Sequence, residues 1–96
     1  MMTTPRIITV DLDGYLCNET CWHPHECEEA TLNQDVAMRT NQDFLQNFIV
    51  IYTARRDHLI PATLRWLRLN GVNFHAISNN KIPADEYRDD KNERGI

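Results

Sequence analysis

The sequence has no long apolar run, no basic stripe and no flexible linker, and each absence excludes a class of protein. No apolar stretch approaches the roughly 20 residues that a membrane-spanning helix needs, so we expect no membrane partner. Only residues 7–10 separate the charges of Arg6 and Asp11, which is too short for the apolar core of a signal peptide. We therefore expect a cytoplasmic protein, whose three cysteines are thiols or metal ligands before they are disulfides.

Basic residues are too scattered to form a track for duplex nucleic acid. The 96 residues carry a formal net charge of −4, and neither half of the chain is basic. This charge argues against nucleic acid as the main partner without ruling it out, whereas a few cations and one metal ion suffice for a small phosphorylated substrate. The absence of repeats and linkers predicts a single domain over residues 1–96. Such a short chain buries only a modest core, so we expect it to form a homo-oligomer.

Apolar segments alternate with segments of helical spacing. The expected strands are 6–12, 47–53 and 72–78, with a very short fourth strand at 86–88. The expected helices run from about 34 to 46, after Asn33 as an N-cap, and from about 58 to 70, before Gly71. Strands separated by helices are typical of a parallel sheet with right-handed crossovers. We predict an α/β fold, a three-layer sandwich with a short parallel sheet and a Rossmann-like core.

The segment 17–33 follows neither the helical nor the strand period. It is polar and dense in cysteine and histidine, and Pro24 argues against a helix there. We expect a loop excursion above the sheet.

Acidic and polar side chains follow the ends of the expected strands. Asp11 and Asp13 end the first strand, Thr53 ends the second, and Asp89 and Asp90 would end the fourth if the tail returns beside the first. Ligands of open α/β sheets bind outside the carboxyl ends of the strands. Carboxylates that converge there repel one another unless a cation lies among them, and an all-oxygen site suits Mg²⁺. Each Asp alone is better explained by a helix cap or a solvated loop charge, but their joint placement reverses this preference and favours a magnesium site.

Four motifs in chain order resemble those of the haloacid dehalogenase (HAD) superfamily of phosphatases. Asp11-Leu-Asp-Gly is similar to the first motif, Phe48-Ile-Val-Ile-Tyr-Thr53 to the second, Lys81 to the third and Asp89-Asp90 to the fourth. The resemblance covers about residues 6–91 and is strongest to small phage and bacterial proteins grouped with capsule-biosynthesis phosphatases. The phosphatase domain of phage polynucleotide kinase is a more distant likeness. The resemblance implies a minimal HAD-like domain without a large cap, which hydrolyses phosphomonoesters with Mg²⁺.

The resemblance also implies a role for each matched residue. Asp11 would attack phosphorus to form an aspartyl-phosphate, while Asp13 would protonate the leaving oxygen and then take a proton from water. Lys81 would offset negative charge in the transition state, and Thr53 would hold a phosphate oxygen. Arg55 follows in the same loop and is a further candidate phosphate contact. The Mg²⁺ ligands would be Asp11, Asp13 through its backbone carbonyl, Asp89 and Asp90.

Potential soft-metal ligands are concentrated in the segment 17–33. They are Cys17, Cys21, His23, His25 and Cys27. A tetrahedral Zn²⁺ site needs four ligands, and the alternation from residue 21 to 27 would place four of them on one face of a strand. The alternative, which the unusual spacing favours, is that Cys17 and Cys27 are small buried apolar residues. Trp22 and the two histidines could instead contact the leaving group of the substrate, because they follow the first motif.

Two departures from the family pattern leave alternatives open. Tyr15 stands where the family usually has Thr or Val, and would either crowd the loop or point outward. Lys81 precedes Asp89 by only eight residues. The alternatives are a catalytically silent HAD-like binding module with a Cys/His loop, and a nucleic-acid 3'-phosphatase.

Overall fold

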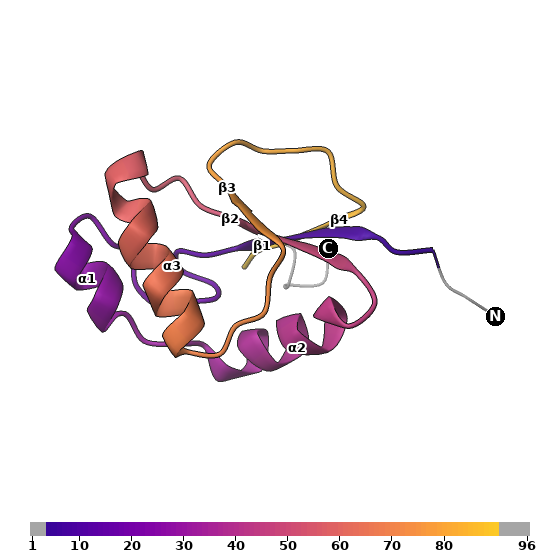
Figure 1. Ribbon diagram of the computed structural model, residues 1–96, viewed down its shortest axis with the longest axis horizontal. Helices are drawn as coiled ribbons and strands as arrows, with labels where there is room; N and C mark the ends of the chain where they lie inside the picture. The colour runs from indigo at the N-terminus through magenta and orange to yellow at the C-terminus, as the bar shows by residue number, and fades with distance from the viewer. Residues whose placement is uncertain (1–3, 91–96) are drawn as a thin grey trace.

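The computed structural model describes residues 4–90, which form an α/β fold around one parallel sheet (Figure 1). The strands are β1 (Ile7–Asp11), β2 (Phe48–Tyr52), β3 (Ala76–Ser78) and β4 (Glu86–Arg88), in the spatial order β3-β2-β1-β4. The helices are α1 (Pro24–Glu29), α2 (Gln34–Phe44) and α3 (Ile60–Leu69), with a 3₁₀ turn, η1 (Asp57–Leu59), before α3. Every strand pairing is parallel, which confirms the predicted Rossmann-like α/β fold. Helices capable of spanning a bilayer are absent from residues 4–90.

The two central strands are buried on both faces, as their nearly continuous apolar character predicted. One face packs against the helices in a core that includes Ile8, Val10, Ile49, Ile51, Ala37, Trp66 and Leu67. Thr9 and Val50 point to the other face and are also buried. Because both faces are buried, β1 and β2 are held in one position in the core. The residues that directly follow them are therefore held in place at the carboxyl edge of the sheet.

The second face of the sheet is covered by the segment 79–85 and not by a helix. This segment crosses from β3 to β4 on the side of the sheet opposite α2 (Figure 1). Asn80 and Ile82 line a cavity together with Thr9 and Val50, so the segment lies directly over the strands. Within residues 4–90, the third layer of the sandwich is therefore an irregular segment, which carries Lys81 over the sheet.

The fourth strand returns beside the first, as the acidic motifs required. β4 pairs in parallel with β1, with Val10 opposite Arg88. The Arg88 guanidinium forms ion pairs with Asp43 of α2 and with Glu86 of β4. These contacts fasten the end of β4 to the helical layer, immediately before Asp89.

The segment 17–33 contains a helix, so the prediction that Pro24 argues against one is wrong. Pro24 opens α1, where a missing N–H costs nothing because the first N–H groups of a helix have no partner within it. The Glu26 carboxylate accepts hydrogen bonds from the backbone N–H groups of Trp22 (2.8 Å) and His23 (3.0 Å), which closes the start of this helix. The other two helices lie close to the predicted ranges, and the Asn33 side chain caps α2 by accepting from the Val36 N–H (3.3 Å).

Tyr15 packs into the core and is 6% exposed, so the interpretation that it points outward is wrong. The preceding Gly14 has a φ of +77°, a conformation that residues with a side chain rarely adopt. This turn follows β1 directly and is followed by Tyr15, which is buried in the core.

Candidate active site

Asp11 is the last residue of β1 and lies at the carboxyl edge of the sheet, beside Tyr52 at the end of β2. Burial, together with the nearby charges of Asp89, Asp13 and Asp90, raises the pKa of Asp11 to about 6. The structure therefore brings the four predicted carboxylates close enough together to interact. Their accumulated negative charge favours either a proton or a cation at this point.

A cavity of about 90 Å³, the small cavity, lies on one side of Asp11. Its lining includes Lys81 and Asp89, which are eight residues apart in the sequence. Lys81 comes from the segment that crosses the sheet, and Asp89 directly follows β4. The short separation is thus enough to bring both residues to Asp11, because the chain crosses the sheet between them without a helix.

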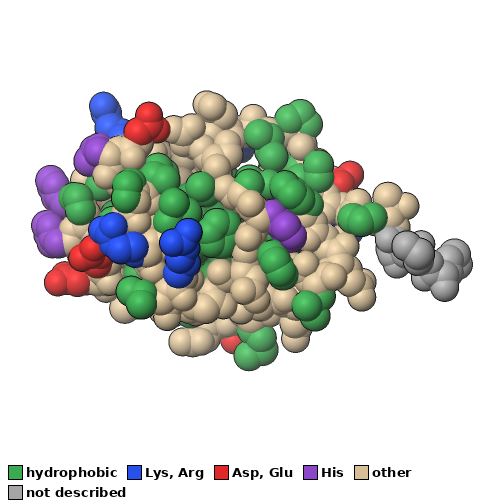
Figure 2. All heavy atoms as spheres, viewed as in Figure 1, with side chains coloured by type: hydrophobic (Ala, Val, Ile, Leu, Met, Phe, Trp, Pro, Cys, Tyr) green, Lys and Arg blue, Asp and Glu red, His purple; other side chains and the backbone are tan. Residues whose placement is uncertain are grey.

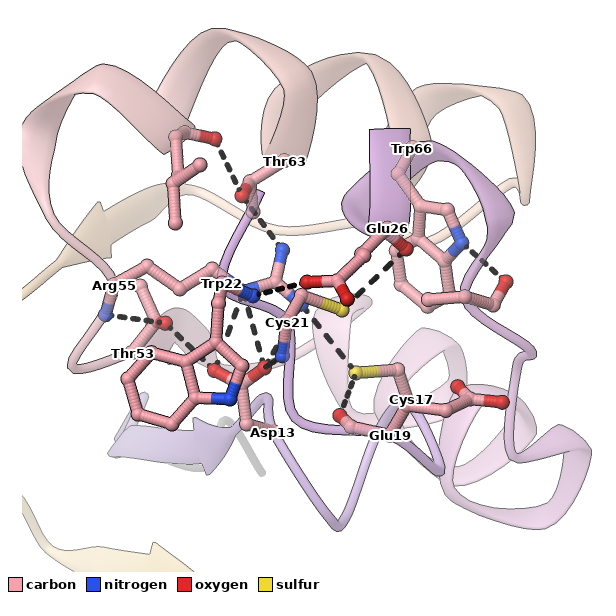
Figure 3. Close-up of polar contacts among 12 residues, drawn as sticks. Asp13, Cys17, Glu19, Cys21, Trp22, Glu26, Thr53, Arg55, Thr63 and Trp66 are labelled. Atoms are coloured by element: carbon pink, nitrogen blue, oxygen red, sulfur yellow. Dashed lines mark hydrogen bonds and ion pairs between the residues drawn. The ribbon is translucent and has the colours of Figure 1, made fainter. Parts of the chain in front are cut away.

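Asp13 is held by a network of hydrogen bonds from a neighbouring loop and turn (Figure 3). Arg55 donates from Nη2 to Oδ1 (2.9 Å) and from Nε to both oxygens (3.1 and 3.3 Å). Thr53 donates from its hydroxyl to Oδ2 (3.1 Å), and the backbone N–H of Cys21 donates to Oδ1 (3.4 Å). Both oxygens of Asp13 therefore accept hydrogen bonds, as those of a carboxylate do.

Arg55 is 5% exposed and directs its guanidinium inward. Besides the bonds to Asp13, its Nη1 donates to the Thr63 hydroxyl (2.7 Å) and its Nη2 to the Cys17 sulfur (3.6 Å). Burial opposes the charge of Arg55, but the hydrogen bond and ion pair with Asp13 outweigh it and raise the pKa of the guanidinium above its ordinary value. The contact that the structure shows is with Asp13, and the predicted contact of Arg55 with phosphate stays a prediction.

Thr53 is also buried and directed at Asp13. Its hydroxyl donates to Asp13 and accepts from the Arg55 backbone N–H (3.1 Å). Its predicted role as a phosphate ligand stays a prediction. Thr63 was not predicted from the sequence, and its place as a polar residue on the buried face of α3 is the signal that would have found it.

A second cavity of about 620 Å³, the large cavity, opens beside both Asp11 and Asp13. Part of its wall comes from residues 20–22 of the predicted excursion, and part from residues 54–59 after β2. The excursion therefore lies beside the carboxylates, and apart from the six-residue helix α1 it is irregular.

The cysteines and histidines of segment 17–33 occupy different environments. Cys17, Cys21 and Cys27 are buried free thiols, and burial raises the pKa of Cys17 to about 11 and that of Cys21 to about 12. His23 and His25 are exposed, and their rings stack with centroids 5.8 Å apart. On the face shown in Figure 2, histidine side chains gather at the end of the molecule where α1 lies.

No three His, Cys, Asp or Glu side chains of residues 4–90 are grouped so as to hold a metal ion. For zinc, thiols with raised pKa values are poor ligands, and the site stays a hypothesis that elemental analysis of protein purified without added metal would test. For magnesium, the donors around Asp11 are of the right kind, because they are all oxygens and carry excess negative charge. The Asp13 backbone carbonyl, which the motif resemblance names as a further Mg²⁺ ligand, stays a prediction.

Comparison with known proteins shows the fold and no family. No family model and no curated protein matches the sequence. A chain from the structure of a Pnkp1/Rnl/Hen1 complex matches 83% of this chain, with a TM-score of 0.65 and 18% identity. A chain from a structure of the Pnkp1/Rnl/Hen1 RNA repair complex matches 99% of it, with a TM-score of 0.68 and 19% identity. In both, this protein spans 30% of the length of the matched chain.

Proposed function

We propose that the protein is a Mg²⁺-dependent phosphomonoesterase of the HAD type, with Asp11 as its nucleophile. The observation that carries this proposal is the place of Asp11, which lines both cavities at the carboxyl edge of the sheet, and where burial and the nearby carboxylate cluster of Asp89, Asp13 and Asp90 give it a pKa of about 6. Such a cluster is costly to the fold, and a phosphoryl-transfer site gives it a use. The motif resemblance assigns the same residues to the same site.

The reaction would proceed in two displacements. An Asp11 carboxylate oxygen attacks phosphorus while the bond to the leaving oxygen breaks, and Asp13 supplies the proton that the leaving oxygen takes. Water then attacks the aspartyl-phosphate and gives its proton to Asp13, so that inorganic phosphate leaves and Asp11 is restored. Lys81, which lines the small cavity with Asp11, offsets the charge of the transferring group. Mg²⁺ held by Asp11, Asp13, Asp89 and Asp90 would supply charge neutralisation for the phosphoryl oxygens.

The network around Asp13 specifies what this residue must do. In the arrangement shown, Asp13 accepts hydrogen bonds from Arg55 and Thr53, so both of its oxygens already have donors. To act first as an acid, it must take up a proton and release at least one of these bonds. Arg55 thus acts on the reaction through Asp13, by setting its position and orientation.

A second candidate function is removal of a 3'-phosphate from a nucleic-acid end. The structural likeness to chains of an RNA repair complex favours it, and so does the distant resemblance to a polynucleotide kinase phosphatase. The net charge of −4 opposes it. Assay of a 3'-phosphorylated oligonucleotide against small phosphomonoesters decides between the two candidates.

The proposal is tested by hydrolysis of p-nitrophenyl phosphate with and without Mg²⁺. We expect Mg²⁺-dependent release of p-nitrophenol, lowered by Asp11→Asn on the order of 10⁴-fold or more. Asp35→Asn is the matched control, because Asp35 is an exposed aspartate at the start of α2 and lines neither cavity. Failure to hydrolyse a broad panel of phosphoesters, with Mg²⁺ demonstrably bound, would favour the catalytically silent module instead.

A further inference from the structure

The two cavities that meet at Asp11 differ in what they can hold. The small cavity measures about 90 Å³, whereas the large cavity measures about 620 Å³. Ligand sites typically measure roughly 300–1,000 Å³. If the phosphoryl group is bound at Asp11, the large cavity is therefore the space for the organic part of the ester.

Trp22 stands on the wall of the large cavity with its indole in water. The side chain is 71% exposed, in contrast to the other tryptophan, Trp66, which is 2% exposed and donates its ring N–H to Ala30 (2.8 Å). An exposed indole leaves a large apolar face without a partner. In Figure 3 this ring extends from the same turn as Cys21, on the side of Asp13.

The backbone that carries Trp22 is held in place on both sides. Its own N–H donates to Glu26 (2.8 Å), and the preceding Cys21 is buried, with its N–H donating to Asp13 (3.4 Å). The cavity wall is thus tied to the residue assigned to proton transfer. A ring on such a support can bind a flat ligand with little loss of backbone freedom.

Polar side chains from the residues after β2, one of them the cationic Arg56, complete the large cavity. Arg56 and His58 line it and are exposed. The Arg56 guanidinium makes no hydrogen bond or ion pair with any side chain of residues 4–90, unlike that of Arg55, which is bound to Asp13 and Thr63. An aromatic face beside an uncommitted guanidinium suits a ligand that is both flat and anionic.

We propose that the large cavity is a nucleotide subsite, in which a nucleobase stacks on Trp22 and Arg56 pairs with an anionic group of the same ligand. This inference rests on the proposed phosphatase function, since it places the phosphate ester of that ligand at Asp11. A sugar phosphate without a base leaves the indole uncovered. The subsite chemistry is shared by free nucleotides and by nucleic-acid ends.

Binding is measured first, because it does not require turnover. Trp22 fluorescence is obtained as the difference between the wild type and Trp22→Phe, since the other indole is buried. We expect adenosine 3'-monophosphate, added with EDTA to prevent turnover, to quench the Trp22 component in a saturable way, and ribose 5-phosphate to leave it unchanged. Equal quenching by the two ligands, or none by either, overturns the nucleobase subsite.

Steady-state kinetics give the second measure. Trp22→Ala should raise KM for adenosine 3'-monophosphate roughly 5- to 150-fold, the value for one base stacked on an aromatic ring, and should raise KM for ribose 5-phosphate by a much smaller factor. Trp22→Phe should restore most of the affinity, because phenylalanine also stacks. Leu69→Ala is the control, since Leu69 is an exposed apolar residue that lines neither cavity. An equal rise of KM for both substrates contradicts the proposal.

The two proposals fail in different ways. Hydrolysis of ribose 5-phosphate without any base-dependent quenching leaves the phosphatase standing and overturns the subsite. Base-dependent quenching without hydrolysis of any ester overturns the phosphatase and supports the subsite. Binding of a 3'-phosphorylated oligonucleotide distinguishes the two kinds of ligand. If it binds more tightly than the mononucleotide, and Arg56→Gln removes this difference, the subsite is for nucleic-acid ends. Equal binding of the two ligands assigns the subsite to free nucleotides.

Discussion

Asp11 and Asp13 are two residues apart but meet opposite surroundings. Asp11 is partly buried near Asp89, Asp13 and Asp90, and its burial together with these charges disfavours its own charge and raises its pKa to about 6. Asp13 faces the guanidinium of Arg55, whose side chain is 2% exposed. The same substitution should therefore have opposite effects on stability at the two positions.

We predict that Asp11→Asn raises the melting temperature in metal-free buffer at neutral pH, and that Asp13→Asn lowers the free energy of unfolding by about 3 kcal/mol. The first removes a repelled charge, whereas the second leaves a buried guanidinium without its partner. Thermal and urea unfolding measure both, with Asp35→Asn as the control, since it removes an exposed charge from the first turn of α2 and should lower stability by only about 0.3–1 kcal/mol. A loss of stability in both variants would show that Asp11 is not repelled by its neighbours.

The gain in stability from Asp11→Asn should depend on pH. Its folded pKa of about 6 lies above the ordinary value of 3.8, so the folded state binds the proton more tightly than the unfolded state. Wild-type stability thus falls as pH rises from about 3.8 to 6, and the loss is complete above 6. The advantage of Asp11→Asn should grow through this window and level off above it.

Arg55 offers a test between orientation of Asp13 and binding of phosphate. We predict that Arg55→Lys lowers kcat for p-nitrophenyl phosphate roughly 10²-fold, because one ammonium cannot reproduce the paired contacts that orient Asp13. KM should stay within a few-fold of the wild type. Arg65→Lys is the control, since Arg65 forms an exposed ion pair with Glu28.

A large rise in KM with little change in kcat would instead mean that Arg55 binds the phosphate, as the sequence suggested. Phosphate inhibition constants of the two variants provide an independent check. They should be equal if Arg55 does not touch the phosphoryl group.

At the scale of elements, β4 depends on α2 for its position. The ion pairs of Arg88 with Asp43 and Glu86 hold the last residue of β4 immediately before the acidic pair. We predict that Arg88→Met raises the Mg²⁺ concentration for half-maximal activity about 10-fold, because residues that support metal ligands typically have effects of this size. Titration of activity with Mg²⁺ measures this.

Arg6→Met is the matched control for that prediction. Arg6 also pairs with Glu86, but its side chain is exposed and lies at the start of β1, away from the carboxyl edge. An equal change in both variants would mean that the effect is a general loss of charge and not a displacement of the acidic pair.

The elements that could be predicted from the sequence are those in which buried positions carry apolar residues in a regular pattern. β1 and β2 are buried on both faces, so they appear as continuous β-branched runs, and α2 and α3 show one apolar face each. β3 is shorter than predicted. Val72 is buried in the core without belonging to a strand. Before β3 begins, the His75 ring, and not a backbone carbonyl, accepts a hydrogen bond from the Ile49 N–H (3.0 Å). The start of α1 at Pro24 depends on the contacts of Glu26 with the backbone N–H groups before the helix. These contacts could not be predicted, because Glu26 is one of many polar residues in this segment.

Side-chain direction was the part of the site that the sequence could not specify. The spacing of the motifs placed Asp11, Thr53 and the acidic pair at one edge, since parallel strands end together. The structure directs the Arg55 guanidinium to Asp13, and Thr63 of α3 accepts a hydrogen bond from its other side. That contact exists only once the helix has packed on the sheet.

At the scale of the whole molecule, metal binding should report on folding. We predict that Mg²⁺ at 100 times its dissociation constant stabilises the wild type by about 2.7 kcal/mol, and that Asp11→Asn shows little of this effect. Because protons compete for Asp11, the Mg²⁺ affinity should fall as pH drops below about 6. Calorimetric scans with and without Mg²⁺ at several pH values measure both effects, and stabilisation that is unchanged in Asp11→Asn would place the ion elsewhere.

The exposed apolar side chains of the helices bear on assembly. Met38 of α2 and Leu69 of α3 are largely in water, and the expected homo-oligomer stays a prediction. Sedimentation at several protein concentrations measures it.

The central claim is that Asp11 becomes phosphorylated during turnover. The direct measurement is rapid acid quenching of the wild type during steady-state hydrolysis, followed by proteolysis and mass spectrometry of the peptide that contains Asp11. We expect the added mass of one phosphoryl group on Asp11 in the presence of Mg²⁺, and none in Asp11→Asn. An active enzyme that never carries phosphate on Asp11, or carries it on another residue, would contradict the assignment of Asp11 as the nucleophile.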